Sequence, residues 1–141
     1  METQVVALGA LLLVTAALGA LWRSRQGRVR APSRRADVDW AAHGVTLGRR
    51  ATFVQLSATV CAPCRATARV LGPFAGAQDG VLHHELDVEQ HLDLTSELRV
   101  LTTPTVLVLD AGGAEVARVH GAMSTARARE ALAAVGDGVT V

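Results

Sequence analysis

The chain has 141 residues, of which 50% are hydrophobic and 19% are charged, and its formal net charge is +1. This length suits one ordinary domain, the composition excludes a disordered chain, and two cysteines are too few for a disulfide-rich secreted mini-protein. The charge is uneven, with six arginines and one acid in residues 1–36 but eight arginines and twelve acids in residues 37–141. The body is therefore net acidic, and we expect no nucleic-acid partner.

The first predicted element is a membrane-spanning helix at residues 5–22, so we assign residues 1–22 to an anchor. Val5–Trp22 contains no charged residue, and eighteen helical residues nearly span a hydrocarbon core of about 30 Å. Trp22 stands where interfacial aromatic residues are common. A cleaved signal peptide is an alternative, although it usually carries positive charge before its apolar run, where this chain has only Glu2. A buried core helix is the other alternative.

Residues 23–37 form an arginine-rich linker between this helix and the body. Six arginines directly after an apolar span predict, by the positive-inside rule, that the body lies in the cytoplasm. The linker can stop transfer and rest on anionic lipid, or it can be a solvated tether. The opposite orientation, with an extracytoplasmic body, is kept as an alternative.

Residues 38–141 are predicted to form an α/β domain with alternating strands and helices. A crossover helix between strands favours a partly parallel central sheet with an antiparallel edge. The expected elements are strands over 51–57, 81–88, 105–109 and 115–120, and helices over 61–77, 92–98 and about 124–135.

Several local signals refine these elements. Gly72-Pro73 predicts an interruption or kink in the second helix of the chain, and Asp110–Gly113 predicts a hairpin turn. Ser124 is a good N-cap for the last helix, and Gly136 a suitable stop. The segment 38–50 is a candidate for an additional edge strand.

Cys61-Ala62-Pro63-Cys64 is the stretch that carries chemistry, because it follows a strand and opens a helix. Two cysteines three residues apart can close a disulfide across a first helical turn, and the helix N-terminus favours the thiolate. Cys61 would then attack and Cys64 would resolve the mixed disulfide, with Pro63 fixing the backbone between them. The alternatives are a buried pair of small residues or half of a zinc site. The chain has no other cysteine and its histidines are scattered, so we expect no bound metal.

From about residue 51 to residue 135 the sequence resembles the thioredoxin family. The resemblance implies a thioredoxin-like fold with a central mixed sheet flanked by helices, a cis Pro104 beside the redox pair, and no bound cofactor. It also implies that Val60, Thr103 and Pro104 contact the client, with the backbone of Thr103 pairing with it as an added strand. The matching residues are Cys61-Ala62-Pro63-Cys64, Leu86-Asp87-Val88-Glu89, Thr103-Pro104-Thr105 and Gly121.

The sequence departs from the family pattern at the redox site. Val60 and Ala62 replace the usual tryptophan and glycine, Gln55 replaces a buried aspartate that helps to deprotonate the resolving cysteine, and Glu85 replaces a neighbouring lysine. We hypothesise that Glu85 supplies the missing carboxylate and that Gln55 orients it or a water molecule. The alternative is that Glu85 points to solvent and water deprotonates Cys64.

These features predict a membrane-tethered thiol–disulfide oxidoreductase that most readily reduces protein disulfides. Its partners would be disulfide-containing client proteins and an upstream thioredoxin reductase or low-molecular-weight thiol, with residues 5–22 in the membrane. One alternative is a non-catalytic interaction module with the same fold. Another is an extracytoplasmic protein that reduces or exchanges disulfides in exported proteins.

Overall fold

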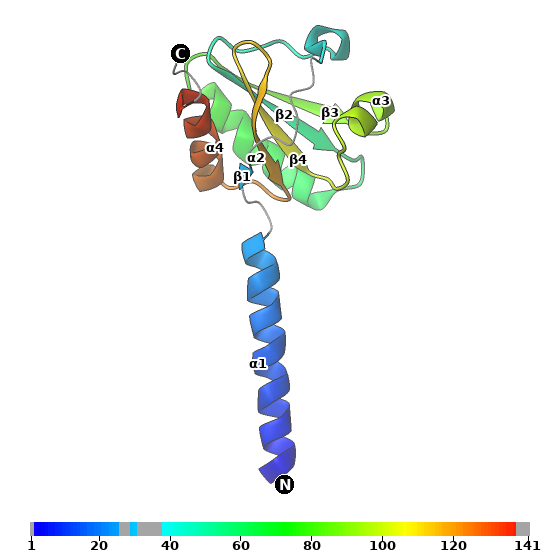
Figure 1. The fold of residues 1–141 in the computed structure, drawn as a ribbon, viewed down its shortest axis with the longest axis vertical. Coiled ribbons are helices and arrows are strands. Elements are labelled where there is room, and N and C mark those ends of the chain that lie inside the picture. The colour runs from blue at the N-terminus through cyan, green and yellow to red at the C-terminus, as the bar shows by residue number, and fades with distance from the viewer. Residues whose placement is uncertain (1, 26–28, 31–37, 138–141) are drawn as a thin grey trace.

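A computed structural model describes residues 2–25, 29–30 and 38–137, and shows one long helix that projects from an α/β body (Figure 1). The strands and helices of the body agree with the predicted ones to within one or two residues at each end. The elements are α1 (Glu2–Arg25), β1 (Val29–Arg30), the 3-10 helix η1 (Trp40–His43), β2 (Ala51–Ser57), α2 (Ala62–Gly76), β3 (Val81–Asp87), α3 (Leu92–Glu97), β4 (Thr105–Asp110), β5 (Glu115–His120) and α4 (Thr125–Asp137).

The central sheet is mixed, as predicted, with the strand order β1-β5-β4-β2-β3. Strands β2 and β3 are parallel and are joined through α2, whereas β4 is antiparallel to both β2 and β5. The tight turn between β4 and β5 is held by Asp110, whose Oδ1 accepts hydrogen bonds from the backbone of Gly112 and Ala114 at 2.9 Å. This topology places the carboxyl end of β2, and the motif that follows it, beside β3.

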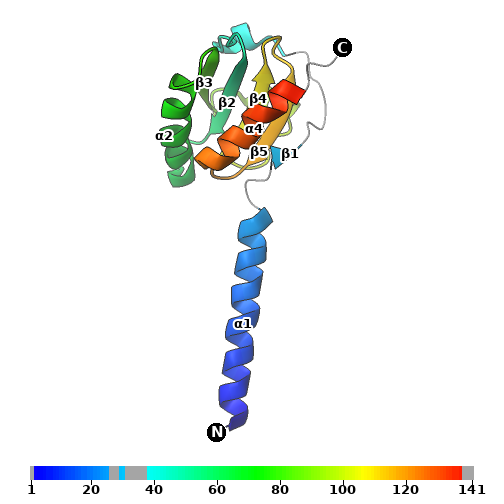
Figure 2. The same ribbon diagram turned by 90° about the vertical axis from the view of Figure 1, so that its left-hand side faces the viewer.

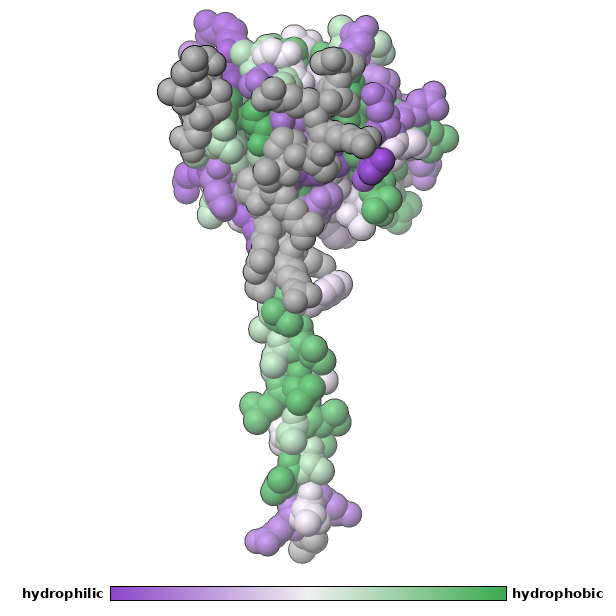
Figure 3. Space-filling model, in the orientation of Figure 1, coloured by the Kyte–Doolittle hydropathy of each residue, from purple (hydrophilic) through white to green (hydrophobic). Residues whose placement is uncertain are grey.

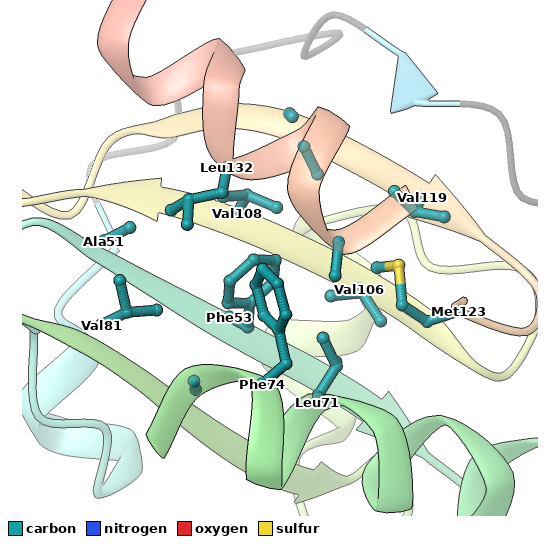
Figure 4. Close-up of a cluster of buried hydrophobic side chains, with 14 of the residues drawn as sticks. Ala51, Phe53, Leu71, Phe74, Val81, Val106, Val108, Val119, Met123 and Leu132 are labelled. Carbon is teal, nitrogen blue, oxygen red and sulfur yellow. The ribbon is translucent and has the colours of Figure 1, made fainter. Parts of the chain in front are cut away.

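Apolar side chains pack on both faces of the sheet. Helices α2 and α4 cover one face (Figure 2), where Phe53 and Phe74 meet edge to face with ring centroids 5.9 Å apart (Figure 4). The other face is covered by α3 and η1, with Trp40 and Leu94 buried against it. Every residue of β2 is buried, so this strand is the rigid support from which the redox motif extends.

The expectation of an edge strand within residues 38–50 is wrong. This segment forms η1, which Asp39 caps by accepting a hydrogen bond from Ala42, and Gly44 ends it in a left-handed conformation. Trp40 is buried and its Nε1 donates to the carbonyl of Gly113 at 2.8 Å. The segment therefore closes the end of the core instead of extending the sheet. An edge strand comes instead from β1, which lies within the linker and pairs antiparallel with β5.

Two expectations about the helices need correction in part. The interruption expected at Gly72-Pro73 is not found, because α2 continues through Pro73 to Gly76 and the Pro73 carbonyl accepts a hydrogen bond from the backbone of Ala77 at 3.1 Å. Ser124 does cap α4, with its Oγ accepting from the backbone of Arg127 at 3.3 Å, but Gly136 lies inside the last turn and not after it.

Helix α1 is long and apolar enough to cross a membrane. Residues Glu2–Trp22 have a mean hydropathy of 2.3, and none of this stretch is buried by the rest of the chain. Figure 3 shows hydrophobic residues along most of the helix, with hydrophilic residues at its N-terminal end. Soluble proteins rarely expose so large an apolar surface. Of the arginine-rich linker, only the helical residues 23–25 and the strand residues 29–30 lie in the described part of the chain.

Candidate active site

The two cysteines open helix α2. Cys61 is the N-cap residue, and its Sγ accepts a hydrogen bond from the backbone of Cys64 at 3.2 Å. Ala62 and Pro63 fill the first helical positions, where a proline costs nothing because its missing N–H would have no helical partner. The two sulfur atoms form a disulfide, with the Cα atoms 5.2 Å apart. Cys61 is 9% exposed and Cys64 only 1%, which makes Cys61 the more accessible of the two.

A groove of about 540 Å³ lies beside this disulfide. The Thr103–Pro104 peptide bond is cis, as the resemblance implied, and both residues line the groove together with Pro63 of the motif. Gly121 also lines the groove, and its backbone N–H donates a hydrogen bond to the carbonyl of Pro104 at 2.8 Å. Val60 is 93% exposed next to Cys61 but does not line the groove. The lining residues are Trp22, Pro63, Thr102, Thr103, Pro104, His120, Gly121 and Ala122.

A polar network lies beneath Cys64, on the face of the sheet that α2 covers. The fully buried Gln55 donates from Nε2 to the Cys64 carbonyl at 2.9 Å and to Ser57 Oγ at 2.9 Å, and also lies 3.2 Å from Glu85 Oε1. Ser57 Oγ in turn donates to Glu85 Oε1 at 2.7 Å. The network therefore holds the Glu85 carboxylate against the sheet although the residue is exposed to solvent.

His83 completes the network and is a residue that the sequence did not single out for the site. Its Nε2 lies 3.2 Å from Gln55 Oε1, so the neutral ring donates there and fixes the orientation of the amide. Burial lowers the pKa of His83 below its ordinary value of 6.5, because the cost of desolvating the cation outweighs the attraction of Glu85, and His84 lowers it further. The ring is thus kept neutral at pH 7, in the tautomer that carries its proton on Nε2.

The lowered pKa of His83 predicts an acid-sensitive fold. Below pH 6.5 the unfolded chain binds the proton more readily than the native chain, so the free energy of unfolding should fall as the pH drops from 6.5 toward the native pKa. His83→Gln keeps a donor near Gln55 and removes the titration. Urea denaturation at pH 7 and at pH 5 should show a smaller loss of stability for this variant than for wild type. Equal losses would contradict the role assigned to His83.

Register explains why Ser57 and His83 join Gln55 and Glu85. Strands β2 and β3 pair in parallel with Gln55 opposite Glu85, so the residues of odd number in both strands face α2. His83 and His84 are adjacent in β3 and therefore point to opposite faces of the sheet. His84 Nε2 contacts the Thr46 carbonyl at 3.0 Å on the other side. In the described part of the chain, no three His, Cys, Asp or Glu side chains are grouped so that they could hold a metal ion.

Comparisons with known proteins agree with this geometry. A family model described as a thioredoxin-like domain matches residues 45–136. Thioredoxin-2 of Saccharomyces cerevisiae is 34% identical over 61% of this chain and 81% of its own length, and the thioredoxin of Alicyclobacillus acidocaldarius is 36% identical over 52% and 70%. The crystal structure of Fasciola hepatica thioredoxin superposes with a TM-score of 0.54 at 28% identity, over 61% of this chain and 81% of that one. The chain therefore belongs to the thioredoxin family, and with its paired Cys61 and Cys64 it is a thiol–disulfide oxidoreductase.

Proposed function

We propose that this protein reduces disulfides in client proteins while it is tethered to a membrane by α1. The observation that carries the proposal is the disulfide pair at the N-terminus of α2, in which Cys61 is the more exposed residue, next to a groove that the cis Pro104 lines. In the reduced protein, the helix N-terminus stabilises the Cys61 thiolate. Cys61 is thus the attacking group, and the groove receives the client backbone at Thr103.

The exchange takes place in two steps. The Cys61 thiolate attacks one sulfur of a client disulfide, forms a mixed disulfide and releases the first client sulfur as a thiolate. Cys64 then loses its proton and attacks Cys61 Sγ, which breaks the mixed disulfide and releases the second client sulfur. The client gains two electrons and two protons, and Cys61 and Cys64 end as a disulfide. An upstream dithiol reductase or a low-molecular-weight thiol returns the pair to the dithiol state.

We further propose that Glu85 takes up the proton that Cys64 loses. Support comes from the hydrogen bonds that hold its Oε1 near Ser57 and Gln55, directly beneath the carbonyl of Cys64. Gln55 cannot act as a base, since an amide has no titration near neutral pH. Its role is to position the carboxylate by contacting both Cys64 and Glu85.

Glu85→Gln is expected to slow resolution of the mixed disulfide by roughly 10²-fold, the lower end of general-base contributions. It should also flatten the dependence of that step on pH, because the accepting carboxylate is gone. Rapid-quench analysis of a mixed disulfide between Cys61 and a client peptide measures the step directly. Glu89→Gln is the matched control, since Glu89 is an exposed carboxylate outside the network. An unchanged rate and pH profile in Glu85→Gln would overturn the proposed relay.

The location of the redox domain belongs to the proposal as well. The span at Glu2–Trp22 supports a tether, and the arginines that follow it support a cytoplasmic body. In a reducing compartment the pair is held as a dithiol, which favours electron donation. A membrane-impermeant thiol reagent, applied after mild reduction, should reach Cys61 only when the cells are lysed. Labelling in intact cells would instead place the domain outside the membrane, where it would act on exported proteins.

A further inference from the structure

We propose that Trp22, at the end of the apolar stretch of α1, is a client-binding residue of the redox site. Its indole would contact an aliphatic or aromatic side chain that flanks the reacting cysteine of the client. This inference rests on the proposed disulfide reduction and adds to it a class of preferred client segment.

The position of Trp22 is the first observation. It lines the groove together with Pro63 of the redox motif and the cis Pro104, although it belongs to a different part of the chain. Figures 1 and 2 both show the end of α1 directed at the body. Trp22 is nevertheless 69% exposed. Much of the indole is thus left uncovered by the body at the edge of the groove, like the other large apolar side chains of α1, but Trp22 is the one of them that lines the groove.

The chemistry of the groove is the second observation. Among the described residues that line it there is no Asp, Glu, Arg or Lys, and His120 is the one titratable side chain. Two large apolar residues lie exposed in the adjacent segments, Val60 at 93% next to Cys61 and Leu101 at 89% just before Thr102. These described side chains offer a charged client residue no opposite charge, whereas burying an apolar client side chain against them is favourable.

Tryptophan is well suited to this role. It buries a large area at a small cost in side-chain entropy, and it is enriched among the residues that dominate binding energy. The motif itself has Val60 and Ala62 where the family carries a tryptophan and a glycine. Among the described residues that line the groove, Trp22 is the one Phe, Trp or Tyr, and it comes from α1, so that the anchor and the client site share a residue.

Two disulfide-linked peptides test the inference, one with leucine beside its cysteine and one with serine at the same position. The protein is the full chain in detergent micelles, and the constants kcat and KM are measured for each peptide. In Trp22→Ala, KM for the leucine peptide should rise about tenfold, as for a residue that contributes strongly to binding, and KM for the serine peptide should change much less. Leu18→Ala is the matched control, since Leu18 is 59% exposed one turn earlier on α1 and outside the groove lining. It should behave as wild type.

Binding supplies a second readout. The leucine peptide in its reduced form should change the intrinsic fluorescence of the wild-type chain, and this change should be lost in Trp22→Ala. The inference would be overturned if Trp22→Ala left the KM of each peptide at its wild-type value and the leucine peptide changed the fluorescence of both proteins equally. Trp22 would then be an interfacial anchor only. Failure of the proposed function is distinct, because wild type would then reduce neither peptide.

Discussion

Cys61→Ser is expected to abolish disulfide reduction, with a loss of at least about 10³-fold, because a serine hydroxyl cannot replace the thiolate that attacks the client. The fold should be retained, since serine is a good N-cap and can accept the same hydrogen bond from the backbone of Cys64. The measurement is reduction of insulin with dithiothreitol as the electron source. Residual activity near the wild-type level would show that Cys61 is not the attacking group.

Cys64→Ser is the informative partner variant. This variant keeps the attacking thiol of Cys61 but lacks the Cys64 thiol that breaks the mixed disulfide. It should therefore accumulate a mixed disulfide between Cys61 and the client, and this species should survive acid quenching. The same assays separate the competing interpretation. A non-catalytic interaction module would leave the rate at the level of dithiothreitol alone in wild type and in both variants.

Arg118→Met should destabilise the folded domain by about 3–5 kcal/mol, as expected when one partner of a buried ion pair is removed. Arg118 makes two parallel hydrogen bonds to Glu115 at 2.6 and 2.7 Å, and its Nη1 donates to the carbonyl of Leu98 at 2.7 Å. Both side chains are more than nine-tenths buried. The substitution leaves the Glu115 carboxylate and the Leu98 carbonyl without their partner. Urea denaturation of the full chain in micelles measures the free energy of unfolding.

The chain offers a matched control for this effect. Arg49 forms an ion pair with Asp79 at 2.9 Å, but these side chains are 81% and 93% exposed. Arg49→Met should therefore cost less than about 1 kcal/mol. The double replacement of Glu115 and Arg118 by leucine and methionine should recover much of the loss, because it removes the unpaired charge. Equal effects of Arg49→Met and Arg118→Met would contradict the account of the buried pair.

The main elements of the fold could be predicted because their signals are local. The alternation over Ala51–Ser57, the apolar run before Asp110 and the turn that follows it define three strands without reference to the rest of the chain. The redox motif also follows from local context, since its first cysteine caps a helix and its proline fills an early helical position. The three strands and the start of α2 depend on backbone conformations that a few neighbouring residues determine.

The features that were missed depend on pairing and packing between distant segments. Trp40 lies in a 3-10 helix, and its indole fixes that helix to the body by donating to Gly113, 73 residues along the chain. The two residues of β1 have no strand signal of their own and are defined by their pairing with β5. Ser57 and His83 join the site through the register between β2 and β3. Glu85 and Gln55 were found because the family pattern drew attention to their positions.

A single turnover of the wild-type chain gives the most direct test of dithiol exchange. The pre-reduced full-length protein is mixed with excess insulin in the absence of any other reductant, quenched with acid, and analysed for client thiols and for its own disulfide by peptide mapping. One chain should release two client thiols and end with Cys61 linked to Cys64, the pairing seen in the oxidised structure. Release of no client thiol, or a final state in which Cys61 and Cys64 remain reduced, would contradict the account.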